Sequence, residues 1–210
     1  MSWKCLLAIV GGVALVAQAQ SPNDLFREGV DLFFAAKPEE SARQFDALIK
    51  ADPTAEPELW QRGLSLYYAD RFQDGREQFE SHRTVNPNDV ENPAWHFACV
   101  ARLDGLEAAR EAMLPVGPDR RVPMKEIIAY YRGEGSPEEI LAAAEAGDEA
   151  GKRNRLCYAH LYLGLFAEAT GDADAAKQHI SLAAGRYSMD HYMGRVAQVH
   201  AQLRQWTPAE

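Results

Sequence analysis

The stretch ELWQRGLSLYYADRFQDGREQFESHRTVNP (Glu58 to Pro87) decides the fold, because its landmarks occur twice in the chain. Its glycine, its phenylalanine and its final proline each have a counterpart 34 residues earlier. The matched pairs are Gly29 and Gly63, Phe45 and Phe79, and Pro53 and Pro87. Several independent matches at one offset indicate an internal repeat.

Each repeat unit is expected to form two helices. Leu25, Leu32 and Phe33 belong to an apolar pattern of helical period in the first half of the first unit. The second half opens with Pro38 and two glutamates, which suit a first helical turn because proline has no N–H and carboxylates favour the positive end of the helix dipole. The unit closes on a proline, as expected just after a helix.

The glycine and the phenylalanine of each unit have a joint physical explanation. A glycine inside a helix costs about 1 kcal/mol relative to alanine. The cost is tolerable if the missing side chain lets the second helix approach closely, with its phenylalanine filling the space beside the glycine. Because two helices cannot bury their whole apolar face alone, the units are expected to stack.

This pattern resembles the tetratricopeptide repeat, and residues 25–53 and 59–87 match it well. The resemblance implies an all-α fold, a right-handed α-solenoid of antiparallel helix pairs. Exported bacterial relatives act as adaptors in envelope assembly, proteolysis or cell-wall synthesis, so the resemblance also implies a protein partner.

The rest of the chain follows the same plan less regularly. We expect one domain over residues 20–206, with units at about 22–53, 56–87, 91–114, 122–147 and 154–187, a capping helix at 189–206 and a tail at 207–210. In the last unit the equivalent positions are Gly164, Ala176 and Ile180. The proline-rich loop 114–123 is either a hinge or an insertion that serves a binding face, and the basic run 151–155 is expected to be a solvated turn.

The first 19 residues have the pattern of a secretory signal peptide. One lysine precedes an uncharged, mostly apolar stretch that ends in Ala17-Gln18-Ala19, which predicts cleavage before Gln20. Cys5 lies before the apolar stretch, so no lipid anchor is expected. The chain is therefore predicted to be periplasmic or secreted and, after cleavage, not inserted in a membrane. The net charge of −9 and the lack of a basic stripe argue against a nucleic-acid partner.

No catalytic motif stands out, and the sequence predicts neither an enzyme nor a cofactor. His96 with Cys99, and Cys157 with His160, have the spacing of a zinc site. Their helices would belong to units about two apart, roughly 20 Å at ordinary helix spacing, which argues against both zinc and a disulfide. The cysteines are instead expected to be buried.

The resemblance places the first helix of each unit on the concave side of the stack. We therefore expect a non-enzymatic scaffold that binds a peptide or a partner helix in an aromatic groove. The predicted partner-binding residues are Phe34, Trp60, Leu64, Tyr67, Tyr68 and Trp95. Two alternatives stay open. The first is an enzyme or metal protein that uses His96, Cys99 and the irregular centre, with Glu126, Tyr130 or Tyr131 in one pocket. The second is a structural subunit whose groove is filled by its own C-terminal helix.

Overall fold

The computed structural model describes residues 20–210, and all regular structure in this range is helical, which confirms the predicted all-α class. The expected signal segment, 1–19, lies outside the described residues. The elements are α1 (Pro22–Phe34), α2 (Pro38–Ala51), the 3-10 helix η1 (Pro53–Glu58), α3 (Trp60–Tyr68), α4 (Phe72–His82), α5 (Glu91–Asp104), α6 (Leu106–Glu111), α7 (Met124–Arg132), α8 (Pro137–Glu145), α9 (Glu149–Thr170), α10 (Ala173–Ala184) and α11 (Tyr192–Leu203).

The first two helix pairs are joined by the same turn, 34 residues apart. After α1, Ala36 adopts a positive φ of 57°, and after α3, Asp70 adopts a φ of 55°. The next backbone N–H, of Lys37 or Arg71, donates to the carbonyl five residues back, at 3.0 and 2.9 Å. A left-handed residue followed by this hydrogen bond is a common way to end a helix. The repeat in the sequence therefore corresponds to a repeat in backbone geometry.

Glycine and its large apolar partner touch in three helix pairs. A Cβ added to Gly29 would lie 2.9 Å from Phe45 Cζ. The corresponding contacts are 2.5 Å from Gly63 to Phe79 Cζ, and 2.6 Å from Gly164 to Ile180 Cγ1. Contacts below 3 Å leave no room for a side chain, so each glycine lets the two helices of its pair approach closely.

Helix α9 begins earlier than the sequence analysis expects. The basic run 151–155 is helical and lies in its first turns, so the prediction of a turn there is wrong. Asp148 provides the N-cap, because its side chain accepts a hydrogen bond from the backbone N–H of Gly151 at 2.6 Å. Capped helix starts of this kind are stabilised by about 1 kcal/mol.

Helices α5 and α9 pack directly on each other, so the expected separation of about 20 Å is wrong. Helix α7 contacts both α5 and α9 but does not separate them. The ring of Phe97 in α5 stacks on that of Phe166 in α9, with centroids 5.4 Å apart. Cys99 and Cys157 are both buried, as expected, and both are free.

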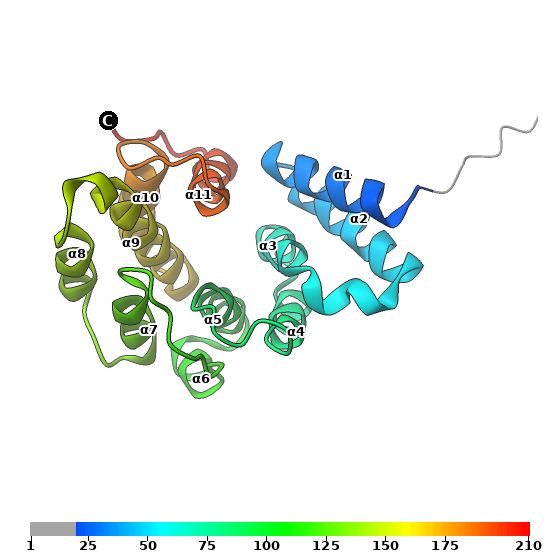
Figure 1. Cartoon of the computed structure of the whole chain (residues 1–210), viewed down its shortest axis with the longest axis horizontal. Coiled ribbons are helices and arrows are strands. Elements are labelled where there is room, and N and C mark those ends of the chain that lie inside the picture. The colour runs from blue at the N-terminus through cyan, green and yellow to red at the C-terminus, as the bar shows by residue number, and fades with distance from the viewer. Residues whose placement is uncertain (1–19) are drawn as a thin grey trace, which may run out of the picture.

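The helices follow a curved path that brings the C-terminal helix back to the first one (Figure 1). Helix α11 contacts α9, α10 and α1. One large apolar cluster extends from Phe33 in α1 through α5 and α9 to Val196 in α11. None of the helices in residues 20–210 combines the length and the apolar character that a membrane span needs.

Candidate functional site

The expected groove is largely covered. Leu64, Tyr67, Tyr68 and Trp95 are at most 5% exposed, so the prediction that they form an open binding surface is wrong. The physical reason is the curvature of the chain, which places α9 and α11 against the face that an open stack would leave free. Phe34 and Trp60 are the two predicted partner-binding residues that remain partly exposed.

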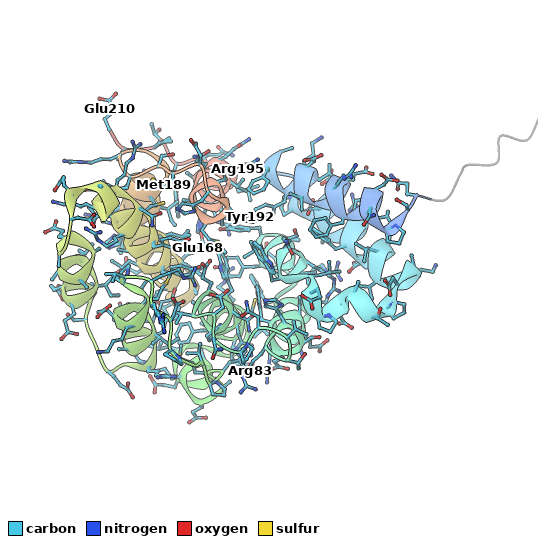
Figure 2. All side chains as sticks on the ribbon, in the orientation of Figure 1. Arg83, Glu168, Met189, Tyr192, Arg195 and Glu210 are labelled. Atoms are coloured by element: carbon cyan, nitrogen blue, oxygen red, sulfur yellow. The ribbon has the colours of Figure 1, made fainter. Side chains whose placement is uncertain are left out.

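Helix α11 covers the groove mainly through Tyr192. Its ring lies edge-on to Phe34 and Trp60, with centroid distances of 4.8 and 4.6 Å. The guanidinium of Arg195, one turn later, lies 3.5 Å from the centroid of the Phe34 ring, a cation–π geometry. Figure 2 shows both side chains on α11, next to α1. The C-terminal helix thus occupies part of the position proposed for a partner.

A largely buried carboxylate holds α11 to the remainder of the chain. Glu168 in α9 accepts hydrogen bonds from His200 at 2.9 Å, from Arg204 at 2.7 Å and from the hydroxyl of Tyr67 at 3.0 Å. The Tyr68 hydroxyl lies 3.0 Å from the other ring nitrogen of His200. Burial alone would raise the pKa of Glu168, but the bonds from His200 and Arg204 outweigh it and hold that pKa well below its usual range.

Residues of α3, α4, α5, α9 and α11 line a cavity of about 330 Å³, which we call the aromatic cavity. Its volume is at the lower end of the range for small-ligand sites. Most of its wall is aromatic or apolar, from Trp60, Phe79, Trp95, Tyr158, Tyr192 and Met193. Its polar residues are His82, Asp89, Glu91, Asn92 and His191. Five helices and the segment before α5 contribute to the wall.

Four wall residues carry a buried polar atom that has no hydrogen-bond partner in the described part of the protein. These atoms are Asn92 Oδ1, Trp95 Nε1, His191 Nε2 and the hydroxyl oxygen of Tyr192. The amide nitrogen of Asn92 is satisfied, because it donates to the carbonyl of Phe79 at 3.0 Å. Buried unpaired polar atoms are uncommon and costly, and here four of them belong to residues that line one cavity, although each atom has less than 1 Å² of accessible surface.

The N-cap of α11 sets the tautomer of His191. Its Nδ1 accepts a hydrogen bond from the backbone N–H of Gly194 at 3.2 Å. Burial lowers the pKa of His191, which favours the neutral ring. A neutral imidazole that accepts at Nδ1 carries its proton on Nε2, so the unpaired Nε2 is a donor. Its ring stacks on that of Tyr158, with centroids 4.9 Å apart.

The loop after α6 forms ion pairs with the acidic residues of the aromatic cavity. Arg121, in that loop, binds the carboxylates of Glu91, Asp89 and Asp119. The Tyr162 hydroxyl donates to Glu91 at 2.9 Å. Burial, assisted by Asp89 and opposed by Arg121, raises the pKa of Glu91 to about 7. The loop 114–123 therefore supports the wall of the cavity, although the sequence left its role open.

The residues of the enzyme or metal alternative are dispersed. His96 is buried and its Nε2 contacts Glu80 at 3.2 Å, while Cys99 lies under Gly75. Neither of them lines the aromatic cavity. Tyr131 is buried and donates to the carbonyl of Tyr162. Burial raises the pKa of the Cys99 thiol well above its usual range, which disfavours the reactive thiolate.

Sequence reasoning misses most of the aromatic cavity. Tyr158, His191 and Tyr192 all come from the last quarter of the chain, and no local motif links them to Trp60 or Asn92. The one available signal is the DHY tripeptide at 190–192, which places a possible N-cap and an aromatic ring at the start of the capping helix.

Comparisons with known proteins do not assign the chain to a family. No protein-family model matches the chain, and none of the curated proteins matches it.

Proposed function

We propose that the chain is an exported, non-enzymatic interaction protein of the tetratricopeptide repeat superfamily. In this proposal it is a right-handed α-solenoid of antiparallel helix pairs, and α11 is the cap. Support comes from the 34-residue offset, which relates the turns at Ala36 and Asp70 and also the glycine contacts of Phe45 and Phe79. No cofactor is needed for this function.

The aromatic cavity is the observation that carries the interaction function. It combines aromatic faces with a few polar groups, which is the composition of sites that bind a group of another molecule. We propose that a segment of a partner protein lies across Phe34 and Trp60 and inserts a side chain into the cavity. The packing of Tyr192 in α11 against Phe34 and Trp60 supports the proposal that this face suits an amphipathic segment.

The test compares two substitutions that each remove a half-buried aromatic ring. Trp60→Ala changes the cavity wall, whereas Phe72→Ala removes a half-buried ring of α4 that packs against Tyr67 and Arg102 outside the cavity. Each purified variant is used to capture proteins from an envelope extract, and the captured partner is then purified for a direct affinity measurement. We expect the affinity to fall at least tenfold for Trp60→Ala and to stay unchanged for Phe72→Ala. Equal affinities for the two variants would contradict the proposal.

A structural role is the second candidate, because α11 fills part of the groove through Tyr192 and Arg195. In that case Trp60→Ala lowers the melting temperature without changing capture of any partner. Circular dichroism of the same two variants separates the two functions.

A further inference from the structure

A second cavity, of about 270 Å³, is lined by helix α7 and by the proline-rich loop 114–123. We call it the basic pocket, because Lys125 and Arg132 of α7 both line it. Its other lining residues are Val90, Val116, Gly117, Pro118, Asp119 and Ile128. None of these residues lines the aromatic cavity, so the basic pocket is a separate site.

The loop wall of the basic pocket is held in place by the segment between α4 and α5. The backbone N–H of Gly117 donates to the carbonyl of Pro87 at 3.2 Å, and Arg83 Nε donates to the carbonyl of Pro115 at 3.0 Å. A wall that is already ordered loses little further freedom when a ligand binds, and this favours affinity.

The two cations of the basic pocket are available to an anionic ligand. Lys125 and Arg132 are exposed, and neither forms an ion pair within residues 20–210. Asp119, the acidic residue of the lining, is already bound by Arg121. Burial alone would raise the pKa of Asp119, but the hydrogen bonds from Arg121 outweigh it and lower that pKa.

This part of the chain is basic although the whole chain is acidic. Residues 115–133 include four arginines and lysines and two acidic residues, whereas the full sequence has 22 and 31. Because opposite charges attract, an acidic ligand is favoured here over a basic one.

The cations and the apolar floor of the basic pocket share one face of α7. Lys125 and Arg132 are seven residues apart, so they lie on the same side of the helix, about 10 Å apart along its axis. Ile128 lies between them in sequence and is 7% exposed. A ligand with two carboxylates on either side of an apolar group matches this face along its whole length.

We propose that the basic pocket binds an acidic segment of a protein, in which two carboxylate side chains flank an apolar one. In an extended segment every second side chain points to the same face, with about 3.3 Å per residue. Two glutamates four positions apart, with a leucine midway, span about 13 Å. The long, flexible side chains of Lys125 and Arg132 are able to reach both carboxylates. This surface goes beyond the proposed function, because it needs neither Trp60 nor the aromatic cavity.

The experiment is an NMR titration of the isotope-labelled protein with the peptide acetyl-Glu-Ala-Leu-Ala-Glu-amide. One matched peptide has glutamine in place of both glutamates, and another has alanine in place of leucine. We expect shifts of the backbone amides in 116–119 and 125–132, and at least about fivefold weaker binding of each matched peptide. Raising the salt concentration from about 0.05 to about 0.5 M should also weaken binding, because exposed charges are screened.

Two substitutions locate the charge contacts. Lys125→Gln and Arg132→Gln each remove one exposed cation and keep a polar side chain, and each is expected to weaken binding about threefold to fivefold. Lys177→Gln is the matched control, because Lys177 is an exposed lysine of α10 that does not line the basic pocket. Circular dichroism checks that every variant is folded.

Four results would overturn the proposal. They are no binding of the acidic peptide, equal binding of its glutamine counterpart, shifts confined to the aromatic cavity, and equal affinities for Lys125→Gln, Arg132→Gln and Lys177→Gln. Sodium octanoate, a single carboxylate on an apolar chain, tests for a small-molecule site, and binding of octanoate without the peptide would also contradict the proposal. None of these results depends on capture of a partner through Trp60, so failure of this proposal and failure of the proposed function are distinguishable.

Discussion

The ring of Phe79 in α4 lies directly against the backbone of Gly63 in α3, so closely that a Cβ on the glycine would come within 2.5 Å of the ring. Both residues are buried, and Phe79 also forms part of the wall of the aromatic cavity. The contact that makes the helix pair compact therefore also positions one side of the candidate site.

Gly63→Ala is expected to destabilise the protein by up to about 2 kcal/mol. Alanine gains helix propensity of about 1 kcal/mol, but forcing a methyl group against a buried ring costs about 1–3 kcal/mol. Urea unfolding measures the difference. The double variant Gly63→Ala with Phe79→Leu tests the cause, since a smaller partner should recover part of the loss. Additive effects of the two substitutions would show that the clash is not with Phe79.

Glu168→Gln is expected to destabilise the protein by about 3 kcal/mol, because it leaves Arg204 and His200 without their largely buried carboxylate. Glu107→Gln is the control, since Glu107 forms an exposed pair with Arg110 and should change the free energy of unfolding by less than about 0.5 kcal/mol. Similar values from urea unfolding for both variants would mean that the Glu168 network does not hold α11 in place.

Glu91 is expected to make the free energy of unfolding depend on pH with a sign opposite to that of most carboxylates. Its pKa is raised from 4.5 to about 7, so the folded state binds the proton more tightly than the unfolded state. The contribution of this group to stability is therefore present below about pH 4.5 and is lost as pH rises through 7.

Glu91→Gln removes this contribution and leaves the other titrating groups in place. We expect the free energy of unfolding of wild type, relative to Glu91→Gln, to decrease by on the order of 2 kcal/mol between pH 5 and pH 8. The difference is measured at each pH by urea unfolding of both proteins. A difference that is constant with pH, or that grows, would contradict the raised pKa.

The export prediction is tested by mass spectrometry of the protein recovered from a secreting bacterial host. Cleavage after Ala19 gives a chain that starts at Gln20. Replacing Ala17 and Ala19 by a bulky residue such as leucine should block processing, because the cleavage site requires small residues at these positions. A recovered chain that still starts at Met1 would show instead that the segment is retained.

Much of the local structure could be predicted from particular residues. Pro38 and the two glutamates that follow it predict the start of α2, and the Leu103-Asp104-Gly105 turn separates α5 from α6, where Gly105 has a φ of 89°. Helix α9 starts at Glu149, earlier than the apolar pattern predicts, because Asp148 is its N-cap. Of the candidate site, the sequence indicated Trp60 and Trp95 but placed Trp95 on a surface, whereas it is buried.

The sequence by itself determined the helical class, the 34-residue repeat and the glycine positions where helices approach, because these depend on contacts between residues close along the chain. Only the tertiary structure decided that α11 returns to Phe34 and Trp60, that α5 meets α9, and that Asn92 and His191 share a cavity. These relationships join residues far apart in sequence. They depend on small rotations between successive helices that add up along the chain, and no short stretch of sequence records that sum.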